Sequence, residues 1–130
     1  MNEVEMLIVE AESKLRAARI LFDNGEYSDA ISRAYYSMHY SARALLSLKN
    51  IYPRTHKGII AQFGLEFVKK GTIEDYYLKS MSTARESRER ADYGIGYKFT
   101  AEEAENIIEN ANRFLERIKK AIENLEVMDK

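Results

Sequence analysis

Residues that interrupt helices are scarce in this chain and gather at a few points. The 130 residues include one proline, Pro53, and six glycines. Because proline and glycine are the residues least favourable in a helix interior, the long stretches between them are free to be helical. Helix-favouring alanine, glutamate, leucine, lysine and arginine are common in those stretches. The pattern predicts an all-α protein with short loops.

The interruptions divide the chain into four long helices and one short one. We expect them at about residues 3–23, 27–50, 55–71, 73–92 and 100–125. In the first, second and fifth, apolar residues recur every three or four positions and therefore share one helix face. Thr100 and Glu103 have the spacing of a capping box, which marks a helix start. The prediction is a single domain over residues 1–130, built as an up-and-down antiparallel bundle of about five helices.

Composition excludes several classes of protein. Without cysteine, the chain has no disulfide scaffold and no thiolate zinc site. His39 and His56 are too few for a multi-histidine metal centre, so we expect neither metal nor cofactor. No stretch approaches the roughly 20 apolar residues of a membrane span, and the start MNEVEML does not resemble a secretory leader. The expected location is cytoplasmic.

Charge is nearly balanced overall but unevenly distributed. Lys and Arg number 20 against 21 Asp and Glu, which gives a net charge of -1 and argues against a surface that is positive throughout. Between Asp29 and Glu66, however, there is no acidic residue, whereas five Lys or Arg residues and both histidines lie there. The acid-rich fifth helix offsets this basic middle. The distribution permits a local basic cleft for phosphate.

The second expected helix has no ordinary polar face. One side is apolar and carries Ile31, Tyr35, Met38, Ala42 and Leu45. The opposite side carries Arg33, Tyr36, Tyr40 and Arg43, without an acid. Tyrosine and arginine are enriched at protein interfaces, and they also stack on bases and contact phosphates. Three interpretations follow: burial on two sides within the bundle, a homodimer interface, or contact with nucleic acid.

The fourth expected helix changes character along one face. Tyr77, Leu78 and Met81 begin an apolar stripe that continues, at helical spacing, as Arg85, Arg88 and Asp92. Arg88 and Asp92 are four residues apart and can pair along the helix. Because burying such charges is costly unless they are paired, they either fix the packing or act on a ligand.

The two histidines have different settings. His56 follows Thr55, a good N-cap, and has the cations Arg54 and Lys57 as near neighbours in the sequence. Free backbone N–H groups and two cations at a helix start can hold a phosphate, and the alternative is an exposed basic loop. His39 lies at the edge of the apolar side of the second helix, a position typical of a structural histidine with its hydrogen bonds satisfied.

Two stretches carry a resemblance to a known family. Residues 32–71, SRAYYSMHYSARALLSLKNIYPRTHKGIIAQFGLEFVKKG, and residues 87–97, SRERADYGIGY, resemble the HEPN domain (higher eukaryotes and prokaryotes nucleotide-binding), especially its small stand-alone prokaryotic members. With the flanking helices the resemblance covers nearly the whole chain. It implies an all-α bundle that forms a homodimer. It also implies either a metal-independent endoribonuclease toxin with an antitoxin partner, or the companion of a nucleotidyltransferase encoded beside it.

The resemblance also implies where the site lies. Active members carry an arginine followed, after four to six residues, by a histidine near the end of a late helix, and two such sites meet across the dimer. The arginine would stabilise charge on the scissile phosphate, and the histidine would assist transfer of the 2′-hydroxyl proton. Here those spacings give Tyr93 after Arg88, Asp92 after Arg85, and Ile95 or Tyr97 after Arg90. None is a histidine.

Three functions therefore compete. The first is a dimeric module that binds RNA or a nucleotide and a partner protein, with Arg54, His56, Lys57 and Arg90 as further phosphate contacts. The second is an active ribonuclease that uses Arg85 and Arg88, with Asp92, Tyr93 or His56 in place of the missing histidine. The third is a purely structural helical scaffold. The absent family histidine favours the first.

Overall fold

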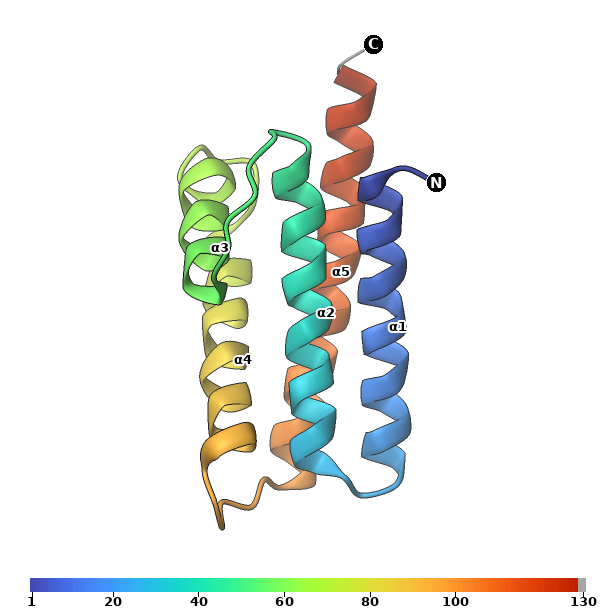
Figure 1. The fold of residues 1–130 in the computed structure, drawn as a ribbon, viewed down its shortest axis with the longest axis vertical. Helices are drawn as coiled ribbons and strands as arrows, with labels where there is room; N and C mark the ends of the chain where they lie inside the picture. Colours follow the sequence, from blue (N-terminus) through green and yellow to red (C-terminus); the bar gives the residue numbers. More distant parts are fainter. Residues whose placement is uncertain (129–130) are drawn as a thin grey trace.

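The computed structural model describes residues 1–128, and that part of the chain is helical and without strands (Figure 1). The elements are α1 (Glu3–Asp23), α2 (Tyr27–Ser47), α3 (His56–Phe63), the π-helix η1 (Gly64–Val68), α4 (Asp75–Tyr93) and α5 (Ala101–Met128). The predicted all-α antiparallel bundle of five helices is confirmed. The capping box is also present, since the Glu103 backbone N–H donates to Thr100 Oγ1 at 3.1 Å and the Thr100 N–H donates to Glu103 Oε1 at 3.3 Å.

Helix α2 occupies the middle of the bundle. It packs against α1 and α5 on one side and against α4 and α3 on the other (Figure 1). This accounts for the missing polar face, because both sides of α2 are covered within a single chain. The loop after α2 runs back along the bundle before α3 begins (Figure 1). The first turn of α3 is thereby brought to the side of α2 that faces α4.

Aromatic packing holds the short α3 and η1 segment in place. The rings of Phe63 and Phe67 are fully buried, with ring centroids 6.2 Å apart. Phe63 also packs on Phe114 of α5 at 5.4 Å. Buried aromatic rings bring large apolar area into a core, so this trio ties the segment to the longest helix. The position of His56 therefore depends on a well-packed core, not on a free loop.

Several helix boundaries differ from the sequence prediction. Helix α2 ends at Ser47, not near residue 50, because Asn50 adopts a left-handed backbone with φ of 58° that cannot continue a helix. Helix α4 begins at Asp75, not at residue 73, because Ile73 packs into the core from the preceding loop and is only 2% exposed. The third expected helix, 55–71, is divided into α3 and the π-helix η1, which ends at Val68, and Gly71, with a φ of 83°, lies in the turn that follows.

Candidate functional site

The start of α3 positions His56 against α2. Thr55 caps the helix, and its Oγ1 accepts a hydrogen bond from the Gly58 backbone N–H at 2.9 Å. A hydrogen bond of 2.8 Å joins His56 Nδ1 and the hydroxyl of Tyr35, whose ring is fully buried. Burial raises the pKa of Tyr35 to about 12, although nearby Arg88 and Arg85 oppose the shift. The hydroxyl therefore keeps its proton at neutral pH and fixes the orientation of the imidazole.

Arg88 enters the same region from α4. It is 8% exposed, and its Cζ lies 5.3 Å from the ring centroid of Tyr35 and 5.7 Å from that of Tyr36. Its Nη1 donates to Asp92 Oδ2 at 3.2 Å, and Ser32 Oγ donates to the other oxygen, Asp92 Oδ1, at 2.6 Å. The expected pair of Arg88 and Asp92 is present. One carboxylate and two aromatic faces offset the cost of burying the guanidinium group.

Arg85 lies one turn earlier on α4 and adds a second positive charge. Its Nη2 pairs with Glu89 Oε1 at 3.2 Å. The Nε atoms of both Arg85 and Arg88 are buried and have no hydrogen-bond partner within residues 1–128. Burial, followed by the positive charges of Arg88 and Arg85, lowers the pKa of His56. His56 is therefore a neutral imidazole near pH 7, held beside two guanidinium groups.

The second histidine belongs to the same group. The ring centroids of His39 and His56 lie 4.6 Å apart, and His39 is 8% exposed. Burial, then the charges of His56, Arg43 and Arg88, lowers the pKa of His39 to about 3. His39 was expected to be a structural histidine with its hydrogen bonds satisfied. It is indeed buried, but its Nδ1 has no partner in the described part of the chain.

We refer to this group as the His–Arg cluster. It consists of Tyr35, Tyr36, His39, His56, Arg85, Arg88 and Asp92. Three helices contribute to it, because α2 supplies the tyrosines and His39, α3 supplies His56, and α4 supplies the other three residues. A neutral imidazole beside two guanidinium groups can bind a phosphate oxygen and can also exchange a proton with a bound hydroxyl.

The cluster makes stability dependent on pH. The pKa of His39 is about 3 in the folded chain but about 6.5 when unfolded, so the unfolded state binds the proton first as pH falls. The contribution of His39 to the free energy of unfolding is complete above about pH 6.5 and is lost progressively as the pH falls below that value. By about pH 5, His39 alone should remove roughly 2 kcal/mol from the free energy of unfolding. Urea denaturation at several pH values measures this loss.

The matched variant for this prediction is His39→Gln, because its side chain does not titrate. Its free energy of unfolding should fall distinctly less than that of the unsubstituted protein between about pH 7 and pH 5. His56, whose pKa is also lowered, leaves a smaller slope of the same sign in the variant. Equal slopes for the two proteins would contradict a neutral, buried His39.

Other residues singled out in the sequence lie outside the cluster. Tyr93, at the end of α4, is 75% exposed. Arg90 is exposed and holds its guanidinium group 5.2 Å from the ring centroid of Tyr97. Arg54 is exposed, while Lys57 is exposed and lines a groove beside the cluster. Within residues 1–128, none of the cluster's hydrogen bonds or ring contacts involves these four residues.

Of the four residues expected at a dimer interface, some pack within the single chain and others are exposed. Tyr36 belongs to the cluster and is half-buried, and Tyr40 packs edge-on against His39 at 5.3 Å. Arg43 lies over the Tyr40 ring at 5.4 Å, and Arg33 is exposed. The tyrosines are therefore partly used within the single chain, and a dimer through this face stays a prediction.

Sequence reasoning missed Ser32 and Tyr35 as parts of the site. Both share one face of α2 with Tyr36 and His39, since the four residues fall at intervals of three, one and three. A polar stripe at that spacing could have marked them. His56 reaches this face because of the path of the loop before α3. The spacing of residues in the sequence does not predict that path.

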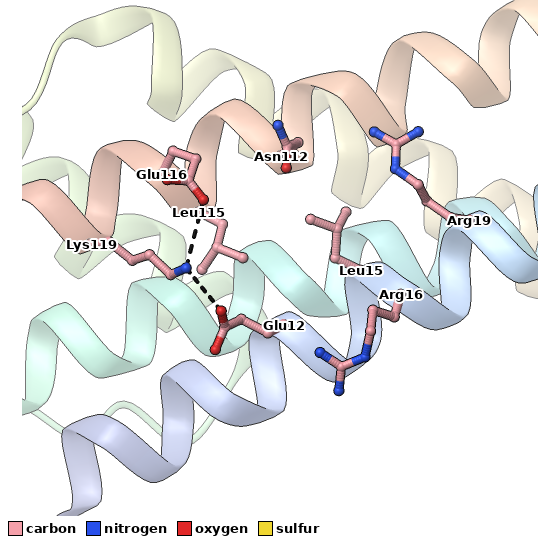
Figure 2. Close-up of a pocket in the computed structure, with 8 residues that line it drawn as sticks. All are labelled: Glu12, Leu15, Arg16, Arg19, Asn112, Leu115, Glu116 and Lys119. Atoms are coloured by element: carbon pink, nitrogen blue, oxygen red, sulfur yellow. Dashed lines mark hydrogen bonds and ion pairs between the residues drawn. The ribbon is translucent and has the colours of Figure 1, made fainter.

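A second groove lies on the far side of α2, between α1 and α5, with a volume of about 230 Å³ (Figure 2). Lys119 Nζ spans it, 2.8 Å from Glu12 Oε2 and 3.6 Å from Glu116 Oε1. Arg16 and Arg19 line the same groove and form no ion pair with any described residue. They are cations remote from the His–Arg cluster, which makes them suitable controls.

Two further observations concern metal ions and membranes. Within residues 1–128, no three His, Asp or Glu side chains are grouped so that they could hold a metal ion. None of the helices in the described range combines the length and the apolar character that crossing a membrane requires.

The fold and the His–Arg cluster define a small helical protein with a phosphate-compatible site at the junction of three helices. A sequence profile of the HEPN domain matches residues 4–122, and the chain belongs to the HEPN family. It is 47% identical to "Putative toxin MJ0605" of Methanocaldococcus jannaschii, over 95% of this chain and 92% of that protein. It is 35% identical to a UPF0332 protein of Thermotoga maritima, over 96% and 98% of the two chains.

A solved structure has the same fold. The chain superposes on TT1696 from Thermus thermophilus with a TM-score of 0.80, covering 93% of this chain and 99% of that one. At 16% sequence identity the likeness concerns the fold alone. The resemblance inferred from residues 32–71 and 87–97 is thus confirmed at the level of the family.

Proposed function

We propose that this protein is a dimeric HEPN module that binds RNA, with a phosphodiester group held at the His–Arg cluster. The observation that carries the proposal is Arg88, whose charged side chain is only 8% exposed and lies beside a neutral histidine. Asp92 and two aromatic rings offset much of the cost of burying this charge, but the Arg88 Nε atom still has no hydrogen-bond partner among the described residues, so a bound anion accounts for the arrangement better than packing alone.

The surroundings of the cluster favour RNA over a free small anion. Tyr36 and Tyr40 are half-buried aromatic residues, and the Tyr36 ring lies 5.7 Å from Arg88 Cζ while the Tyr40 ring lies 5.4 Å from Arg43 Cζ. Unstacked RNA bases stack on such rings. Relatives that carry toxin names support a toxin–antitoxin setting, and a nucleotidyltransferase is the other expected partner. The dimer would form through α2 and the Arg-rich end of α4.

Binding and sedimentation test this proposal together. Fluorescence anisotropy with a labelled single-stranded RNA, in EDTA, should show saturable binding that weakens as salt rises, because phosphate contacts release counterions. Sedimentation at micromolar concentration should give the mass of two chains. A monomer at that concentration would refute the dimer, and no change in anisotropy or melting temperature with RNA would refute the binding function.

A second candidate, metal-independent cleavage of RNA, is favoured by the hydrogen bond between Tyr35 and His56. When Nδ1 carries the imidazole proton and donates it to the Tyr35 oxygen, Nε2 is free to accept a proton. His56 could then take the proton of a 2′-hydroxyl while its oxygen bonds to phosphorus. The bond from phosphorus to the 5′-oxygen breaks, this oxygen takes a proton from water, and a 2′,3′-cyclic phosphate remains. Arg88 and Arg85 would stabilise the charge on phosphorus oxygens.

A further inference from the structure

A groove of about 300 Å³ lies between α3 and α4, directly beside the His–Arg cluster. The residues that matter along it are Lys57, Ile60, Ser82, Arg85, Glu86 and Glu89. Arg85 belongs to both the groove and the cluster, and Lys57 follows His56 in the chain. An RNA strand with one phosphate at the cluster would therefore place a neighbouring nucleoside at this groove.

The lining of the groove suits a flat ring with hydrogen-bond donors along its edge. Ile60 contributes an apolar wall, as in most sites for small planar groups. Glu86 and Glu89 supply carboxylates, which accept hydrogen bonds and donate none when ionised. Glu89 is occupied by Arg85 at 3.2 Å, whereas Glu86 forms no hydrogen bond or ion pair with any residue of the described chain. A second phosphate is disfavoured there, because two carboxylates would repel it.

The bases differ in what they offer a carboxylate. Guanine presents two adjacent donors on its Watson–Crick edge, N1–H and the N2 amino group, which match the two oxygens of one carboxylate. Adenine and cytosine present a single amino group next to an acceptor, and uracil presents one N–H between two carbonyl oxygens. Single-stranded RNA is commonly read along this edge while the base stacks on aromatic or guanidinium planes.

We propose that the groove between α3 and α4 is a nucleobase subsite that prefers guanine, with Glu86 accepting hydrogen bonds from the guanine edge. The inference rests on the proposed RNA-binding function and adds the base that this function selects. Arg85 provides a guanidinium plane at the boundary with the phosphate site, and Lys57 and Ser82 face the sugar and backbone.

Short RNAs test the subsite. Pentanucleotides of uridine, with the central base kept or replaced by guanine, adenine or cytosine, are titrated in EDTA by anisotropy. A bidentate base contact discriminates by about 1–3 kcal/mol, so the guanine RNA should bind at least about fivefold more tightly than the uridine RNA. Glu86→Gln should bring this ratio near one while uridine RNA binds as well as before or slightly better, because a negative charge is gone.

The control variant is Glu105→Gln, an exposed glutamate on α5 away from the groove, and it should keep the guanine preference. Equal affinities for the four RNAs, or a preference that survives in Glu86→Gln, would overturn the subsite while leaving RNA binding intact. Failure of every RNA to bind would overturn the proposed function and the subsite with it. Glu86 is exposed, so circular dichroism should show an unchanged fold for its variant.

Discussion

Arg88→Ala is expected to weaken RNA binding in EDTA by about 10- to 100-fold. Hydrogen bonds to charged groups contribute about 1.5–3 kcal/mol, and a guanidinium group can donate two of them to one phosphate. Arg88 is the cation that the bundle buries most deeply among its described residues, at 8% exposure. Its removal should also reduce the slope of affinity against salt by roughly one phosphate contact. Anisotropy over a series of salt concentrations measures both quantities.

The controls must separate binding from folding, because Arg88 also neutralises Asp92. Without the Arg88 side chain the Asp92 carboxylate has no ion-pair partner among the described residues, which should lower the free energy of unfolding by about 1–3 kcal/mol. Urea denaturation measures this change. Arg88→Lys keeps the charge but loses the planar guanidinium group, so its affinity for RNA should lie between those of the unsubstituted protein and Arg88→Ala. Arg16→Ala, in the opposite groove shown in Figure 2, removes the same charge and should change affinity less than about threefold. A folded Arg88→Ala protein with undiminished affinity would contradict the account.

His56→Asn is expected to separate binding from cleavage. A general base contributes about 10²- to 10⁴-fold to a rate, so any metal-independent cleavage by the unsubstituted protein should fall by that amount. RNA affinity should change only a few fold, because the lowered pKa of His56 makes it neutral near pH 7 and it adds no charge to the complex. Cleavage of a labelled RNA in EDTA, followed by gel, measures the rate.

Tyr35→Phe provides the companion control. It removes the hydroxyl that lies 2.8 Å from His56 Nδ1 but keeps the buried ring. Cleavage should slow and its dependence on pH should shift, because the tautomer of His56 is no longer fixed, while RNA affinity stays unchanged. Cleavage that persists in His56→Asn would point to a contaminating nuclease or to Asp92 as the base. If the unsubstituted protein binds RNA without cutting it, the cleavage candidate is wrong and the binding function stands.

Much of the fold was predictable from local sequence rules. Asn24 and Gly25 end the first helix, the capping box at Thr100 begins the last, and three- and four-residue spacing defines the buried faces. The early end of α2 and the late start of α4 have local causes that spacing does not reveal. Asparagine tolerates a left-handed backbone without requiring one, and an isoleucine can be buried outside a helix as well as within it.

The site was only partly predictable. The break from an apolar to a charged stripe located Arg85, Arg88 and Asp92, and the buried position of Arg88 agrees with that inference. Their meeting with His56 could not be derived, because it depends on a loop that runs back along α2 and on the packing of Phe63. The family spacing pointed to Tyr93, yet its side chain is exposed at the end of α4. Long-range packing therefore decides which residues form the cluster.

Nuclear magnetic resonance provides the most direct test of where RNA binds. The isotope-labelled protein is titrated with a short single-stranded RNA in EDTA while the side-chain signals of histidine and arginine are followed. The account predicts saturable shifts for the His56 imidazole and for the guanidinium groups of Arg85 and Arg88, with Arg16 and Arg19 unchanged. Shifts confined to Arg16 and Arg19, or an unmoved His56 and Arg88 at saturating RNA, would contradict it.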